Sequence, residues 1–194
     1  MLSWLKEACT MNQKLTTKQI ALIAMGVALI TVCSWISIPA TVPFTLQTFA
    51  VCLVTAVFGL RMGIWAVLCY ILLGAVGAPV FSGFKGGFGA LLGTTGGYII
   101  GFLFTALIVG TAVKKWGRNM PILILSMALG ILLCYTFGTA WFMLVYAKKS
   151  GPIGIGTALG WCVIPYLIPD GAKIVLAALL TGRLYPIMKK GNLL

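Results

Sequence analysis

Long runs of apolar residues, separated by short charged or broken segments, dominate this chain. No charged side chain occurs from 19 to 60, from 62 to 84, from 86 to 113 or from 119 to 147. Each interval can hold roughly 20 apolar residues in a row, which is the length of a helix that crosses a ~30 Å hydrocarbon core. The pattern predicts an integral membrane protein made of spanning helices.

Two prolines divide the first interval. Proline removes a backbone donor and clashes with the preceding helical turn, so Pro39 and Pro43 predict a helix end near Ile38 and a helix start near Leu46. A tight connection at 59–61 then separates two short spans. The sequence thus predicts an all-α bundle of six transmembrane helices, with bounds good to about ±2 to 4 residues, at 19–38, 46–60, 62–78, 91–113, 120–146 and 169–187.

The segment 147–168 is apolar but broken by glycines and prolines, so it could be a seventh span or an outer, partly helical loop. The distribution of Lys and Arg favours the loop, because basic residues beside spans mark the cytoplasmic side. Six spans leave only Lys85, Lys148 and Lys149 outside, whereas seven would export the basic C-terminus. We therefore expect both termini in the cytoplasm, on the same side as Lys6, Lys14, Lys18, Arg61, Lys114, Lys115, Arg118, Arg183, Lys189 and Lys190.

Composition removes several classes of function. The chain has 61% hydrophobic and 8% charged residues, a mean hydropathy of +1.10, and a net charge of +12. In a soluble protein this charge would suggest a nucleic-acid partner, but beside apolar spans it marks cytoplasmic loops. With no histidine, two acids and six cysteines in no C-x-x-C pair, we expect no metal site, no cofactor and no enzyme activity.

Residues 1–15 differ from the rest of the chain. The segment LSWLKEA is mildly amphipathic, so we expect a cytoplasmic or interfacial helix, or an extension ahead of Met11 that is not native. Residues 16–194 are expected to form one six-helix, substrate-binding membrane domain.

Asp170 and Lys173 are ionisable residues inside a predicted span, three residues apart on one helix face. Ionisable groups at membrane depth are costly, so they usually face the protein interior and pair with each other or with a ligand. Either a structural ion pair or a binding site would explain them. Pro169 and Asp170 at the predicted helix start favour a site, because unpaired N–H groups there favour an anion.

Two further segments are candidates. The segment PATVPFTLQTF either covers a pocket or is an ordinary turn, because irregular backbone near membrane depth is tolerated only where it is buried or lines a cavity. The glycines at 89, 93, 97 and 101 share one predicted helix face and favour close helix packing. The preceding GFKGGFG, which carries Lys85, suits a movable gate. Its spacing is not that of a nucleotide-binding P-loop.

Three segments in this order, VPFTLQTF, GAPVFSGFKGGFGALLGTTGGYIIGF and IPDGAKIVLAALLTGRL, resemble the BioY family, the biotin-specific S components of energy-coupling factor (ECF) transporters. The resemblance runs from about Lys14 to the C-terminus. It implies a multi-pass protein of the bacterial plasma membrane that captures biotin at its extracellular side. It also implies two kinds of partner, a transmembrane coupling protein and two cytosolic ATPases. Biotin would be the transported ligand and not a cofactor.

The resemblance also suggests roles for single residues. Biotin carries two ureido N–H donors, one C=O acceptor and an anionic carboxylate. Asp170 could accept from the N–H groups while Lys173 donates to the C=O, and Gln47 or Thr45 could complete the set. The opposite orientation, with the carboxylate on Lys173, stays open.

The apolar rings of biotin would lie against Phe44 and Tyr98, and its carboxylate could meet Lys85. Ala24 and Ala28 lie on a small-residue face of the first helix, which by default packs within the chain. In the resembled family this face docks on the coupling protein, so both alanines become candidates for partner docking. A different vitamin, such as thiamine or riboflavin, or a non-transporting structural subunit remain the alternative functions.

Overall fold

The computed structural model describes residues 16–40, 42–191 and 193. The expected cytoplasmic or interfacial segment at 1–15 lies outside these residues. In the described part, five helical stretches are long and apolar enough to cross a membrane. They are α2 (Thr17–Trp35), α3 (Gln47–Val76), α5 (Gly96–Trp116), α6 (Met120–Ser150) and Ile155–Lys190, which contains α7 (Ile155–Cys162) and α8 (Ile164–Lys190).

Helix α3 is two spans joined by a single residue. Gly59 has φ 81° and ψ −178°, a backbone conformation that only glycine adopts readily. A Cβ built on Gly63 would lie 2.8 Å from the Cα of Thr55, although residues eight apart in a straight helix are separated by about 12 Å. The chain therefore folds back on itself at Gly59. Counting the two legs separately gives the six spans that the sequence predicts.

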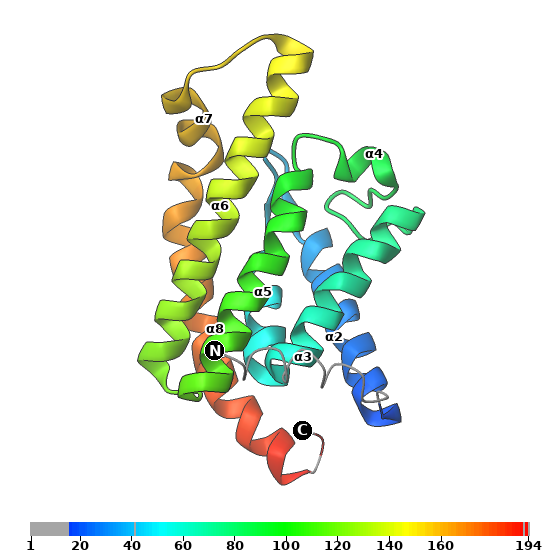
Figure 1. Ribbon diagram of the computed structural model, residues 1–194, viewed down its shortest axis with the longest axis vertical. Coiled ribbons are helices and arrows are strands. Elements are labelled where there is room, and N and C mark those ends of the chain that lie inside the picture. The colour runs from blue at the N-terminus through cyan, green and yellow to red at the C-terminus, as the bar shows by residue number, and fades with distance from the viewer. Residues whose placement is uncertain (1–15, 41, 192, 194) are drawn as a thin grey trace, which may run out of the picture.

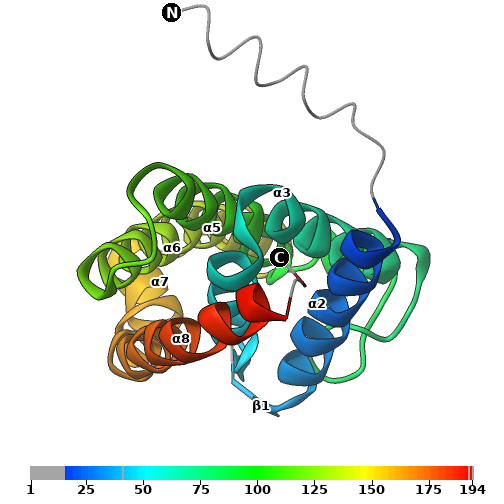
Figure 2. The same cartoon turned by 90° about the horizontal axis from the view of Figure 1, so that it is seen from below.

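The two legs of α3 form the centre of the bundle. Helix α3 packs against α2, α5 and α8, while α6 packs against α5 and α8. Figures 1 and 2 show this arrangement from the side and from below. Buried apolar side chains from all five long helices form one continuous core. Many leucines and isoleucines on the outer helix faces stay exposed, as expected for surfaces that contact lipid.

The glycine-rich segment is not the continuous helix that the sequence predicts from 91 onward. The short α4 (Phe88–Leu91) ends before a turn, and α5 begins at Gly96. Of the four spaced glycines, only Gly97 and Gly101 share a helix, and both permit close approach of α6. A Cβ on Gly97 would lie 2.3 Å from Trp141, and one on Gly101 would lie 2.8 Å from the Sγ of Cys134. Gly89 has open space instead.

The connection from α6 to the last span is short. Helix α6 extends to Ser150, α7 occupies Ile155–Cys162, and α8 follows after a break at Val163. The described residues of 147–168 thus form no separate seventh span, and α8 begins five residues earlier than the sequence predicts. The segment before α3 contains a small antiparallel hairpin of β1 (Ser37–Ile38) and β2 (Phe44–Thr45).

The start of α2, the turn between α5 and α6 and the end of α8 lie at one end of the bundle (Figure 1). These segments carry Lys18, Lys114, Lys115, Arg118, Lys189 and Lys190, so we call this the basic end. Arg118, in the turn between α5 and α6, stabilises this end of the bundle. Its Nε donates to the backbone oxygen of Ala56 at 2.8 Å, and a terminal nitrogen donates to the backbone oxygen of Val57 at 3.2 Å. These carbonyls lie just before the break at Gly59, which would otherwise leave them without helical partners. The guanidinium also lies 3.6 Å from the ring centroid of Tyr185 on α8.

Candidate functional site

A cavity of about 580 Å³ opens at the end of the bundle away from the basic end. Its walls come from the start of α3, the segment 81–95 that contains α4, the first half of α5, the middle and last turn of α6, the end of α7 and the first half of α8. The loop before α3 also lines it, through Ala40, Val42 and Pro43. That loop is therefore part of the cavity wall. Of the two interpretations of PATVPFTLQTF, the cavity-lining one agrees with its position.

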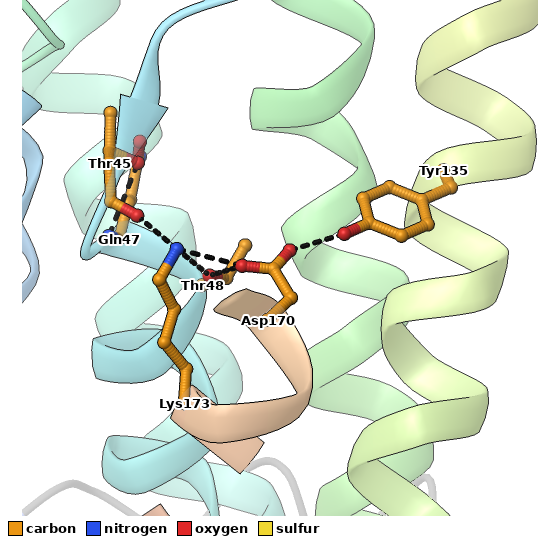
Figure 3. Close-up of polar contacts among 6 residues, drawn as sticks. All are labelled: Thr45, Gln47, Thr48, Tyr135, Asp170 and Lys173. Atoms are coloured by element: carbon orange, nitrogen blue, oxygen red, sulfur yellow. Dashed lines mark hydrogen bonds and ion pairs between the residues drawn. The ribbon is translucent and has the colours of Figure 1, made fainter. Parts of the chain in front are cut away.

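Asp170 and Lys173 lie together in the wall of this cavity (Figure 3). The Nζ of Lys173 is 2.7 Å from the Oδ1 of Asp170, and the two residues are only 7% and 4% exposed. Burying two charges costs several kcal/mol per ion unless each is paired and hydrogen-bonded. The remaining polar atoms of this pair must therefore have partners as well.

Those partners come from three other elements. Tyr135 of α6 donates a hydrogen bond to Oδ2 of Asp170, and Thr48 of α3 donates to Oδ1 at 3.2 Å. Lys173 donates to the backbone oxygen of Thr45 at 2.6 Å and contacts the hydroxyl of Thr48 at 3.4 Å. The ion pair thus connects α3, α6 and α8 at one point (Figure 3).

The N-terminus of α8 does not stabilise the carboxylate of Asp170, contrary to the prediction. Asp170 lies six residues after Ile164, in the second turn of α8, and Pro169 is inside the helix. The effect of a helix dipole falls off within the first turn. What holds the carboxylate is the set of side chains around it, namely Lys173, Thr48 and Tyr135.

Lys173 and Asp170 differ in how many hydrogen-bonding positions remain available to a ligand. Lys173 has three N–H groups, and its three hydrogen-bond contacts use them all. A carboxylate has about four acceptor positions, and hydrogen bonds from residues within 16–40, 42–191 and 193 occupy three of those of Asp170. Asp170 can therefore accept a further N–H donor without losing a protein contact, whereas Lys173 must give up one to donate elsewhere.

Gln47 and Thr45 also line the cavity. The amide nitrogen of Gln47 donates to the hydroxyl of Tyr70 at 2.7 Å, and this hydroxyl donates to the backbone of Val80 at 3.0 Å. This direction leaves the amide oxygen of Gln47 as the group that a ligand could use. The hydroxyl of Thr45 accepts from the backbone nitrogen of Gln47 at 3.2 Å, at the start of α3.

The two predicted aromatic walls have different positions. Tyr98 lines the cavity, and its hydroxyl bonds the hydroxyl of Thr139 at 2.9 Å. Phe44 is not among the lining residues. Its ring stacks on Tyr166 with centroids 6.1 Å apart and lies 3.9 Å beneath the Nζ of Lys173. Phe44 therefore stabilises the ammonium group of Lys173 by a cation–π contact and does not form part of the cavity wall.

The remaining predicted residues lie farther from the ion pair. Lys85 is exposed and lines the cavity from the segment between α3 and α4. Ala24 and Ala28 are on the outward face of α2, away from the cavity. Gly26 of α2 packs inside the chain instead, and a Cβ there would lie 3.0 Å from Val54.

Two contact residues were absent from the predicted site. Thr48 belongs to the VPFTLQTF segment, so its sequence neighbours already pointed to it. Tyr135 lies in the middle of the apolar run 120–146, where no spacing or motif links it to a residue 35 positions later. The only signal available was a hydroxyl group in the middle of a span.

A model of the BioY family matches residues 11–190 of this chain. The chain belongs to the BioY family. Its members are transporter subunits and not enzymes. The predictions of this family, and of a helical bundle like that of an S component, are confirmed.

Individual BioY proteins and a solved structure give the same result. The chain is 37% identical over 168 residues to a probable biotin transporter BioY of Pyrococcus horikoshii, covering 86% of this chain and 96% of that protein. It is 40% identical over 158 residues to the biotin transporter BioY of Thermotoga maritima, with 81% and 89% covered. A crystal structure of the S-component for biotin from an ECF-type ABC transporter superposes with a TM-score of 0.77 at 26% identity, over 88% of this chain and 94% of that one.

Proposed function

We propose that this BioY chain is the biotin-binding S component of an ECF-type transporter, and that the cavity beside Asp170 is its biotin site. The observation that carries the proposal is a buried ion pair in the wall of a cavity of about 580 Å³, in a chain of this family. Ligand pockets of roughly 300–1,000 Å³ with a few convergent polar groups suit small molecules. Residues 16–194 act as one substrate-binding membrane domain.

In the favoured orientation, the ureido ring of biotin lies against Asp170. A ureido N–H is a donor, and Asp170 has one acceptor position left beside the bonds from Tyr135 and Thr48. The amide oxygen of Gln47 can accept the second N–H. Lys173 pairs with the carboxylate of Asp170 and can donate to the ureido C=O by exchanging its long 3.4 Å contact to Thr48.

The apolar part of biotin then packs against Tyr98 and the neighbouring apolar side chains of α5 and α6, and its valerate chain points toward the loops, with Lys85 near the carboxylate. The reverse orientation would place the carboxylate on Lys173. That lysine already pairs with Asp170 at 2.7 Å, so a second carboxylate would lie close to the first and be repelled. The contacts therefore favour the ureido group at the ion pair.

The distribution of charges supports one membrane orientation. Positively charged residues concentrate at the end of the bundle where α2 begins and α8 ends, and such residues face the cytoplasm. Both termini are then cytoplasmic, and the cavity opens to the extracellular side of a bacterial plasma membrane. Biotin thus meets the site from outside the cell.

Energy for uptake comes from partners, a transmembrane coupling protein and two cytosolic ATPases. The described residues place Ala24 and Ala28 on the outward face of α2, where small side chains let another helix approach closely. This position supports α2 as the face that docks on the coupling protein.

Calorimetry on the purified protein tests the biotin site. We expect biotin to bind, thiamine and riboflavin not to bind, and Asp170→Asn to weaken biotin binding at least about 100-fold, because an acceptor of charge-assisted bonds is lost. Asp170→Asn with unchanged biotin affinity would remove Asp170 from the site. Binding of another vitamin in place of biotin, or of none, would overturn the function itself.

A further inference from the structure

The cavity carries two lysines at its loop end, far from Asp170. Lys85 comes from the segment between α3 and α4, and Lys149 comes from the last turn of α6. These two elements lie on different sides of the bundle (Figure 1). The backbone nitrogen of Phe81 donates to the oxygen of Lys85 at 2.9 Å, which fixes the base of that side chain. Lys148, the neighbour of Lys149, does not line the cavity.

No acid balances these two charges among residues 16–40, 42–191 and 193. Asp170 is the one acidic residue in that part of the chain, and it is buried beside Lys173. The loop end of the cavity is therefore positive. An anionic group that entered it would meet two cations and no like charge.

The direction of α6 aims Lys149 into the cavity. Side chains on a helix tilt toward its N-terminus, so a lysine in the last turn of α6 points back toward Tyr135. Tyr135 and Lys149 are 14 positions apart, which is about 21 Å along a helix, and the lysine side chain covers part of this distance. Lys149 therefore faces the same cavity as Asp170, from its loop end.

We propose that Lys149 and Lys85 form an anion subsite that binds the free carboxylate of biotin, so that the site distinguishes the free acid from neutral derivatives. This inference rests on the proposed function and deepens it. Lys149, which the sequence indicated only as an extracellular charge, becomes a specificity-determining residue. Biotin esterified or amidated at its carboxylate would lose both contacts.

The expected contribution is moderate, because both lysines are exposed. Exposed ion pairs contribute little each and are screened by salt, with a Debye length of about 10 Å at 0.1 M and about 3 Å at 1 M. The preference for free biotin over its neutral derivatives should therefore be clear at low ionic strength and should shrink at high ionic strength. A preference based on shape alone would not depend on salt.

The test compares the Kd of biotin with the Kd of biotinamide, its neutral amide, for the purified protein and four variants. The variants are Lys85→Gln, Lys149→Gln, the double variant, and Lys148→Gln as a matched control with the same loss of charge one position away. We expect the full chain to bind biotin about tenfold more tightly than the amide at low salt. Lys149→Gln should lower this ratio about threefold, the double variant should bring it near one, and Lys148→Gln should change it less than twofold.

Three results would overturn the inference. One is equal affinity of the full chain for acid and amide, which would leave the biotin site itself intact. Another is an equal effect of Lys148→Gln and Lys149→Gln on the ratio of the two Kd values. The preference would then come from the general positive charge of the surface and not from a subsite. The third is an acid preference that stays constant as salt rises. Failure of both ligands to bind would instead overturn the proposed function, and the subsite with it.

Discussion

Tyr135 of α6 donates a hydrogen bond to the same carboxylate of Asp170 that forms an ion pair with Lys173 three residues along α8. The tyrosine bonds Oδ2, and the lysine bonds Oδ1. Helix α6 therefore helps to orient an acid that belongs to α8. A ligand that reaches this acid contacts a carboxylate already fixed from both sides.

Replacing Tyr135 with Phe removes that hydroxyl and little else. We expect biotin affinity to fall about 5- to 20-fold, because the lost bond is charge-assisted and no longer orients the carboxylate. The matched control is Tyr146→Phe on the same helix, since Tyr146 packs on Phe142 and Trp161 and does not line the cavity. Equal affinity of the two variants would show that the Tyr135 hydroxyl has no role in binding.

Lys173 should be necessary for stability as well as for binding. Lys173→Met leaves the carboxylate of Asp170 buried without its counter-charge, which typically costs about 3–5 kcal/mol. We expect a large drop in the thermal midpoint of the detergent-solubilised protein.

The double variant Asp170→Asn with Lys173→Met provides the control for this effect. It should recover much of the midpoint, because no unpaired charge remains, yet still fail to bind biotin. A double variant as unstable as Lys173→Met alone would contradict the ion-pair explanation.

Gly59 should not tolerate a side chain. Its φ of 81° with ψ of −178° is a region that residues with a Cβ avoid, so Gly59→Ala should cost about 1–3 kcal/mol of stability. Gly160→Ala is the control, because a Cβ there meets open space and α7 has ordinary helical geometry. The two thermal midpoints should differ by several degrees, with Gly59→Ala lower. A straightened α3 would instead leave Gly59→Ala as stable as the parent.

A bulky side chain on the outward face of α2 should impair docking on the coupling protein and leave biotin binding unchanged. Ala28→Leu places a bulky side chain where we expect the coupling protein to approach, and α2 provides no residue to the cavity lining. Co-purification with the coupling protein and ATPases should fall at least tenfold, while the Kd for biotin stays unchanged. Ala147→Leu, an exposed alanine on α6, should leave the assembly intact. Full assembly of Ala28→Leu would place the docking face elsewhere.

The sequence alone determined the class of this protein, predicted the six spans and placed Asp170 and Lys173 on one helix face. Charge-free intervals, prolines and the spacing of Asp170 and Lys173 depend on local rules: backbone donors, the thickness of the membrane and the cost of charge in it. Such rules act within a few turns of one helix. The same rules predicted a tight connection that includes Gly59. They did not predict that the chain reverses its direction at this single residue.

Only the tertiary structure decided which side chains meet. Tyr135 reaches Asp170 from 35 positions away, Phe44 lies beneath Lys173 and not in the cavity, and Lys149 lines the cavity while Lys148 does not. Each of these depends on how whole helices rotate and cross as they pack. No pattern within one segment contains that information, because the packing partner of a helix face lies elsewhere in the chain.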